Sequence, residues 1–219
     1  MTVLWHTWVQ AFPAFLGGVR VTLELTGVSL LIALVLGFLL ALARLSGVGV
    51  LRGAATGVVE VIRSIPTLIL LFTAYYSLPQ IGITVSGFVA AVGTLGIFYA
   101  TLYGEIFRGA ILAVDRGQRE AAQALGLSPV TSLRTVILPQ AFLRILPPAT
   151  NQLSNLIKDT SLVFTIGLAD LMFQAYNAGA SNFRYFDMFI LAGVLYFACY
   201  LILSKLLARW EMNVQRQRA

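Results

Sequence analysis

Long apolar runs constrain this chain most strongly, because a membrane is the only solvent that suits several of them together. A helix needs about 20 mostly apolar residues to cross the hydrocarbon core of a bilayer. Runs of that length occupy residues 21–43, 58–78, 85–107 and 188–208. A fifth region, 142–173, is long enough but is interrupted by the polar residues 158–161. The sequence therefore predicts an all-α integral membrane protein of about five transmembrane helices.

The composition supports one membrane domain over residues 1–219. Hydrophobic residues make up 58% of the chain and charged residues only 11%, which is far more apolar than a soluble domain. The net charge of +6 comes from basic residues scattered between apolar runs. This scatter argues against nucleic acid as a partner, because nucleic-acid binding gathers such residues on one stripe. The lipid bilayer is the expected surrounding.

Neither enzyme chemistry nor a metal site is expected from the residue types present. With one cysteine, Cys199, and one histidine, His6, the chain cannot assemble a Cys/His metal centre or a nucleophilic triad. It also lacks the Gly-x-x-x-x-Gly-Lys-Ser/Thr loop that holds a nucleotide phosphate. We therefore expect no catalytic residues, no metal ligands and no cofactor in this chain.

The distribution of arginines predicts the orientation of the spans. With the amino terminus outside, only Arg20 and Arg184 lie outside. The cytoplasmic side then collects Arg44, Arg52, Arg108, Arg116, Arg119, Arg134, Arg144, Arg209, Arg216 and Arg218. Such a positive-inside bias places the carboxy terminus and the segment 108–144 in the cytoplasm of a multi-pass inner-membrane protein. The first twenty residues contain Trp5, Trp8, Phe12 and Phe15 and are expected to form an interfacial segment.

The cytoplasmic segment carries the pattern of a short helix. Residues 118–125 are good helix formers, Gly126 stands where a left-handed cap belongs, and Pro129 opposes continuation. Such a short helix needs a protein surface for support. Its alanines make it thin, and Leu125 and Leu127 offer apolar anchors, so it suits insertion into a groove. Packing against the chain's own spans is the alternative.

Four stretches of the sequence together resemble one protein family. The cytoplasmic segment has Glu120-Ala121-Ala122, then Gly126, then Ile137-Leu138-Pro139. This order is similar to the signature loop of bacterial ATP-binding-cassette importer permeases. The flanking runs 103–111 and 155–162, together with Arg63-Ser64-Ile65-Pro66-Thr67, resemble the polar amino-acid branch, of histidine, glutamine and arginine type. The resemblance covers residues from about 15 to 207.

This resemblance implies a type I importer permease fold and a set of partners. The segment 112–140, between spans three and four, would hold a coupling helix that docks on a dimer of ATPase subunits, which bind ATP and magnesium. The expected coupling residues are Gly117, Glu120, Ala121, Ala122, Leu125, Gly126, Leu127 and Pro139. A second permease copy or a paralogue would complete the pore. An extracytoplasmic binding protein would deliver the amino acid.

Ionisable residues inside the apolar runs mark a candidate substrate path, because charges at membrane depth usually face a bundle interior or water. The candidates are Glu60, Arg63, Glu105, Asn155, Lys158, Asp159 and Thr160. Glu60 with Arg63, and Glu105 with Arg108, are three residues apart and could form ion pairs. These pairs could instead merely neutralise each other near the interface. Lys158 and Asp159 are adjacent, so at least one must find another partner.

Prolines and small residues predict local geometry within the spans. Pro66 should kink the second span, and Pro147 with Pro148 could kink the fourth region. Gly37 and Ala41, four residues apart in the first span, should permit close helix packing.

Two other functional classes remain open at this stage. An ion-coupled secondary transporter would need internal repeats, and none is apparent. A membrane anchor or assembly subunit would leave the cytoplasmic signature and the intramembrane charges without a purpose.

Overall fold

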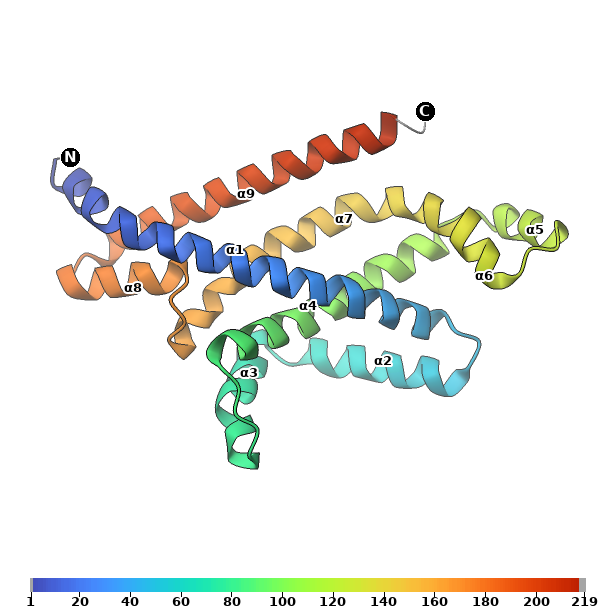
Figure 1. Ribbon diagram of the computed structural model, residues 1–219, viewed down its shortest axis with the longest axis horizontal. Helices are drawn as coiled ribbons and strands as arrows, with labels where there is room; N and C mark the ends of the chain where they lie inside the picture. The colour runs from blue at the N-terminus through green and yellow to red at the C-terminus, as the bar shows by residue number, and fades with distance from the viewer. Residues whose placement is uncertain (1, 217–219) are drawn as a thin grey trace.

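The computed structural model describes residues 2–216, with side chains placed for residues 8–207 and Arg209, and this part of the chain is helical without strands. Four long helices dominate: α1 (Thr2–Leu45), α4 (Gly87–Leu112), α7 (Leu138–Asp159) and α9 (Tyr185–Arg216). They run along the long axis of the molecule, with α8 (Leu171–Asn182) at the end where α1 begins (Figure 1). The all-α architecture expected from the sequence is confirmed.

The core forms where α1 crosses α4 at close range. A β-carbon added at Gly37 would lie 2.9 Å from the carbonyl oxygen of Ala100, and one added at Gly104 would lie 3.1 Å from that of Gly37. Ala33 and Ala41 are fully buried on the same side of α1. Small residues let two backbones approach each other closely in a membrane helix pair. The packing role predicted for Gly37 and Ala41 is confirmed.

The chain bends sharply at Pro66. Proline disfavours helical geometry in the residue before it, and Ile65 is extended, with φ −98° and ψ 129°. Helix α2 (Gly49–Ser64) therefore ends there, and the segment that follows turns by 99°. That segment comprises α3 (Thr67–Phe72), a π-helical turn (Thr73–Ser77) and a 3-10 turn (Leu78–Ile81). Leu71 of α3 is buried in the core, whereas the later part of the segment extends away from the long helices (Figure 1). The kink expected at Pro66 divides the predicted run 58–78.

The fourth apolar region is also broken, as its polar residues predicted. Helix α7 ends at Asp159, a 3-10 segment covers Thr160–Ile166, and Gly167 ends that segment in the left-handed conformation with φ +78°. Helix α8 then starts behind Asp170, whose carboxylate accepts a hydrogen bond of 2.9 Å from the Phe173 amide. By contrast, Pro147 and Pro148 lie inside α7 without ending it. The interruption is therefore at Thr160, and the prolines leave the helix continuous.

The helices differ in whether they are long and apolar enough to cross a membrane. Within residues 2–216, three helical segments are: Trp8–Leu45, Gly87–Leu112 and Tyr185–Leu207. The bent pair of helices around Pro66 makes a fourth if it is taken as one span. Helix α7 is more polar, so a count of five spans stays a prediction.

The amino-terminal region forms one helix with the first apolar run. Helix α1 begins at Thr2 and continues without a break into that run. The Trp8 indole donates a hydrogen bond of 3.2 Å to the Asp187 carbonyl of α9, and Phe15 is fully buried. Trp5 lies outside the described side chains. Arg20 lies within α1 and pairs with Glu24 at 2.7 Å. The interfacial location of the first twenty residues stays a prediction.

Candidate functional site

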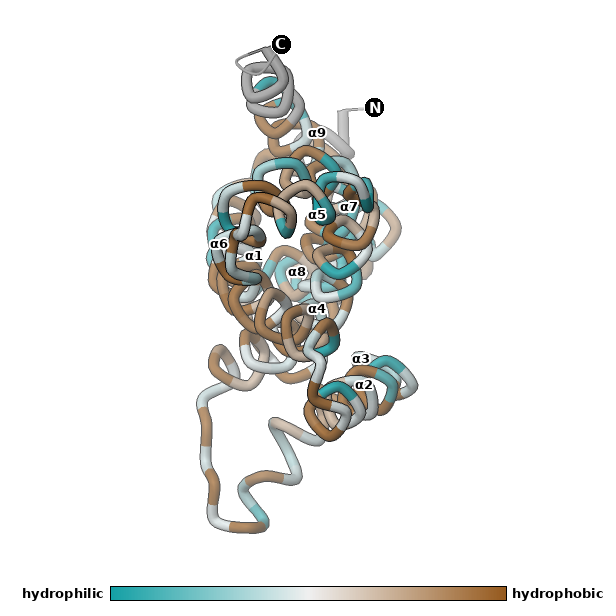
Figure 2. Tube along the Cα trace, turned by 90° about the vertical axis from the view of Figure 1, so that its right-hand side faces the viewer, coloured by the Kyte–Doolittle hydropathy of each residue, from teal (hydrophilic) through white to brown (hydrophobic). Residues whose placement is uncertain are grey.

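A pair of short helices caps the end of the molecule opposite the start of α1. Helix α5 (Arg116–Ala124) and helix α6 (Pro129–Ser132) project beyond α4 and α7 (Figure 1). Figure 2 looks onto this end and shows hydrophilic residues along α5. The Asp115 carboxylate begins α5 by accepting a hydrogen bond of 2.7 Å from the Gly117 amide, as expected of an N-cap residue. The predicted helix therefore exists, starting two residues early and ending one residue early.

Gly126 ends this helix in the conformation that the sequence predicted. Its φ is +71°, in the left-handed region where a β-carbon is strained. The Gly126 amide donates a hydrogen bond of 2.9 Å to Gln123, and the Leu127 amide donates one of 3.1 Å to Ala122. These bonds satisfy the last carbonyls of α5. The turn therefore fixes where α5 stops and where Leu125 points.

Hydrogen bonds from side chains of α5 and α7 hold α5 and the ends of α4 and α7 together. The Arg119 guanidinium donates a hydrogen bond of 2.6 Å to the Ile111 carbonyl in the last turn of α4. The Gln140 amide of α7 donates to the Gln118 side chain at 3.1 Å. Arg144 of α7 donates to the carbonyl of Ala113, just beyond α4. Helix α5 is thus tied to the ends of α4 and α7, so a displacement of α5 is transmitted to both helices.

The eight predicted coupling residues divide into an outer and an inner set. Exposed on the outer side are Gly117, Glu120, Ala121, Leu125 and Gly126, while Leu127 and Pro139 are half-buried and Ala122 is buried. Leu125 has 78% of its surface exposed. Val130 of α6, at the same protruding end, is 66% exposed, and several exposed apolar side chains gathered among polar ones are typical of a binding surface.

A second polar site lies where α7 breaks. The Asp159 carboxylate accepts a hydrogen bond of 2.8 Å from the Tyr99 hydroxyl of α4, while Lys158 is exposed. The expectation that these neighbours would not satisfy each other is confirmed. Thr160 is buried, and its hydroxyl donates to the Ile157 carbonyl at 2.7 Å, so it stabilises the helix end. Sequence reasoning missed Tyr99, because nothing local connects it to a residue 60 positions away.

Helix α7 also presents a polar face. Asn151, Asn155 and Lys158 are exposed, and their spacing of four and three residues places them on one side of the helix. Such groups are costly against lipid. This face therefore requires water or another protein beside it.

A third cluster surrounds Glu105, away from the break. Its carboxylate accepts hydrogen bonds from Arg108 at 3.0 and 3.1 Å, so the predicted pair forms. It also pairs with Arg44 at the end of α1, a long-range partner that sequence reasoning missed. The cluster joins the ends of α1 and α4 and is only partly exposed, which favours a structural role over one in the path.

Replacing Glu105 with glutamine should weaken the contact between the ends of α1 and α4. Arg44 and Arg108 would then share a neutral group, so we expect the free energy of unfolding to fall by about 1–2 kcal/mol. This is less than the cost of breaking a fully buried pair, because the cluster is partly exposed. The melting temperature in detergent should fall by roughly 2–8 °C. Glu24→Gln is the matched control, because its pair with Arg20 has side-chain exposures of 46% and 82% and should contribute little. Equal melting of both variants would contradict the assignment.

The remaining predicted pair does not form. Glu60 and Arg63 are both exposed on α2 and share no ion pair among the described residues. Exposed pairs three residues apart on a helix gain only a few tenths of a kcal/mol. Nothing holds these two long side chains together, so the prediction of a pair is wrong.

Asp170, another acidic residue in the apolar regions, is fully buried. Besides capping α8, it accepts a hydrogen bond of 3.1 Å from the Tyr196 hydroxyl of α9. Nearby, Thr22 of α1 accepts one of 3.2 Å from the Leu171 amide. These bonds join α1, α8 and α9 and give Asp170 a structural explanation.

Comparison with known proteins agrees with this geometry. Residues 33–218 match the family described as the binding-protein-dependent transport system inner membrane component. The arginine transport system permease protein ArtQ of Bacillus subtilis is 38% identical over 197 residues, 90% of each chain. The glutamine transport system permease protein GlnP of Escherichia coli K12 is 37% identical over 213 residues, 96% of this chain and 97% of that one.

Solved structures resemble the fold over almost the whole chain. An amino acid ABC transporter crystallised with histidines has a TM-score of 0.87 at 36% identity, covering 94% of this chain and 96% of that one. The MetNI methionine ABC transporter, in an inward-facing conformation, has a TM-score of 0.80 at 25% identity, covering 93% and 97%. The predicted type I importer permease fold is confirmed. This chain belongs to the family of inner-membrane permease components of binding-protein-dependent ABC transport systems.

Proposed function

We propose that this chain is the permease subunit of an ATP-driven importer for polar amino acids. The observation that carries the proposal is helix α5, a protruding helix with an exposed Leu125 that is tied by hydrogen bonds to the ends of α4 and α7. A partner moving against α5 would transmit its movement to both spans. The substrate class is supported by the arginine and glutamine permeases among its relatives.

The partners follow from this role. Two ATPase subunits bind ATP and magnesium and dock on α5 from the cytoplasm, and this chain holds no cofactor of its own. A second permease copy or a paralogue lies against the polar face of α7. A binding protein delivers the amino acid outside. The start of α1 is extracytoplasmic and the end of α9 cytoplasmic, as the arginine distribution and the placement of α5 opposite the start of α1 support.

The solute passes the polar face of α7 and the break at Asp159. An amino acid carries an ammonium and a carboxylate, and this face offers Asp159, Lys158 and the amide of Asn155. A break in a membrane helix also exposes backbone groups that can meet a solute. Glu60 and Arg63 line the same path from α2 of the assembled pore, whereas the contacts of Glu105 and Thr160 give both structural roles.

The docking role of α5 is tested by Gly126→Val. Valine at a φ of +71° costs about 1–2 kcal/mol in the native turn, so Leu125 loses its position and ATPase binding weakens about 5- to 30-fold. Gly82→Val is the matched control. Gly82 has φ +84°, and at Gly82, as at Gly126, no atom would lie within 4 Å of an added β-carbon. Gly82 however lies in the loop before α4, far from α5 in the sequence. The measurement is the amount of ATPase subunit that copurifies with the tagged chain.

The control separates docking from folding. ATPase lost from Gly126→Val but retained by Gly82→Val supports the proposal. Equal ATPase in both variants contradicts a docking role for this turn. Wild-type protein that copurifies no ATPase would point instead to an ion-coupled transporter or an anchor subunit.

A further inference from the structure

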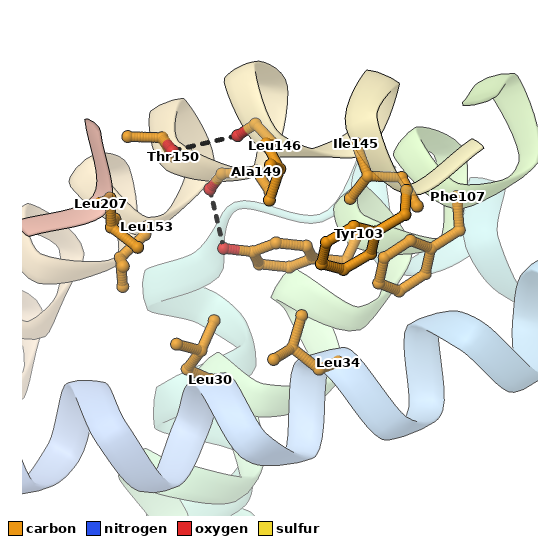
Figure 3. A pocket seen from close by; sticks show the side chains of 11 residues that line it. Leu30, Leu34, Tyr103, Phe107, Ile145, Leu146, Ala149, Thr150, Leu153 and Leu207 are labelled. Carbon is orange, nitrogen blue, oxygen red and sulfur yellow. Dashed lines mark hydrogen bonds between the residues drawn. The ribbon is translucent and has the colours of Figure 1, made fainter. Parts of the chain in front are cut away.

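An apolar cavity of about 370 Å³ lies inside the helical bundle, away from the polar sites. Its walls come from α1, α4, α7 and the later part of α9, where Leu207 contributes (Figure 3). Leu30 and Leu34 of α1 lie across from α7, and Tyr103 and Phe107 of α4 lie between them. Leu30 and Leu34 lie in the middle of the apolar part of α1, whereas Tyr103, Phe107 and Leu207 lie in the second halves of α4 and of the apolar part of α9. The cavity therefore reaches from the hydrocarbon core toward the end of the molecule that carries α5.

The few polar groups on the cavity wall already have partners. The Tyr103 hydroxyl donates a hydrogen bond of 3.0 Å to the Ala149 carbonyl, and the Thr150 hydroxyl donates one of 3.0 Å to the Leu146 carbonyl (Figure 3). No charged side chain is among its described lining residues. A bound water needs two to four polar partners, and an amino acid or ion needs more. The cavity therefore suits an apolar occupant.

The cavity is separate from the proposed solute path, because it lies on the other side of α7. At about 100° per residue, the side chain of Ala149 points roughly 120–180° away from those of Asn151, Asn155 and Lys158 around the helix axis. The polar face must avoid lipid, so the neighbouring subunit belongs on that side. The face that lines the cavity then lies on the side away from that subunit.

The cavity is partly open to the surface of the bundle and is not enclosed. The helices that wall it also carry exposed apolar side chains, with Leu31 65% and Val35 62% exposed on α1 and Leu206 57% exposed on α9. In a membrane-spanning chain such a surface meets lipid tails when no protein covers it. An acyl chain can therefore enter the cavity from the surrounding bilayer.

We propose that this cavity binds an acyl chain of a membrane phospholipid. Its volume is more than twice that of the roughly 150 Å³ apolar cavity that binds benzene, so a chain segment of several methylenes fits. An empty cavity would deprive its wall of van der Waals contacts, and the bilayer supplies acyl chains at high concentration. The occupant holds the later part of α9 against α1 and α7.

Native mass spectrometry of the assembled transporter, washed with increasing detergent, tests this proposal. Ala149→Phe places a ring inside the cavity, whereas Val194→Phe places one on α9 at a position that is 51% exposed. We expect wild type and Val194→Phe to retain one phospholipid per copy of this chain. Occupancy in Ala149→Phe should be at least about tenfold lower, a difference of about 1.4 kcal/mol in binding. Equal retention in both variants, or no retained lipid in wild type, would overturn the proposal.

A second measurement keeps the proposal testable if Ala149→Phe fails to fold. A photoreactive leucine analogue at position 34 keeps the shape of the native side chain and reacts with whatever fills the cavity. The expected product in native membranes is an adduct with the mass of a phospholipid. An adduct with a second permease copy would show that a protein side chain occupies the cavity and would overturn the lipid assignment.

Discussion

Replacing Gly37 with leucine should prevent α1 and α4 from packing and leave little assembled protein. Any β-carbon at Gly37 would lie 2.9 Å from the Ala100 carbonyl and 3.0 Å from the Gly104 amide nitrogen. These are backbone atoms of α4, so they cannot rotate away as a flexible side chain could. Overpacking usually costs about 1–3 kcal/mol, and a clash with backbone along the main helix pair should reach or exceed the upper end.

The measurement is the melting temperature and monodispersity of the tagged protein in detergent. Gly27→Leu is the matched control, because Gly27 lies on the same helix and nothing would approach its β-carbon within 4 Å. We expect Gly27→Leu to behave as wild type and Gly37→Leu to aggregate or to melt several degrees lower. If the two variants melt together, α1 and α4 do not pack as closely as the structure places them.

Replacing Asp159 with asparagine should strongly impair uptake while assembly survives. Asparagine keeps a carbonyl oxygen that can accept the bond from the Tyr99 hydroxyl, so the local geometry is preserved. It removes the negative charge that we propose meets the ammonium of the solute. A hydrogen bond to a charged group contributes about 1.5–3 kcal/mol, so uptake of the solute should fall by about 10- to 150-fold.

Tyr99→Phe separates the two roles that Asp159 could have. This variant leaves the charge in place but removes the hydrogen bond, so a solute-binding Asp159 predicts a smaller loss of uptake than in Asp159→Asn. If Asp159 serves only to bond Tyr99, the order reverses, because asparagine retains that bond and phenylalanine does not. Uptake of radiolabelled amino acids into proteoliposomes with the ATPase and the binding protein decides between the two results.

Much of the fold could be predicted because its signals are local. Apolar runs long enough to cross a membrane exclude a soluble fold. The bend at Pro66, the break at Thr160 and the turn at Gly126 each follow from the backbone limits of proline, of polar residues in an apolar run, or of glycine. Helix α5 was predicted to within two residues for the same reason.

One local prediction was wrong because the pattern did not include the neighbours. Glu60 and Arg63 had suitable spacing, but nothing beside α2 holds them together. Spacing shows that two side chains can meet, whereas the surrounding structure decides whether they do.

By itself the sequence determined the membrane environment, the helical class, the breaks and the cytoplasmic signature, since each depends on residues within a few positions of one another. Only the tertiary structure decided which polar side chains meet: Arg44 with Glu105, and Tyr99 with Asp159, pair across about 60 residues. It also decided that α7 has a polar face opposite an apolar cavity. Hydrophobicity sets where a helix lies, but partners distant in sequence are chosen by packing geometry, which no local pattern records.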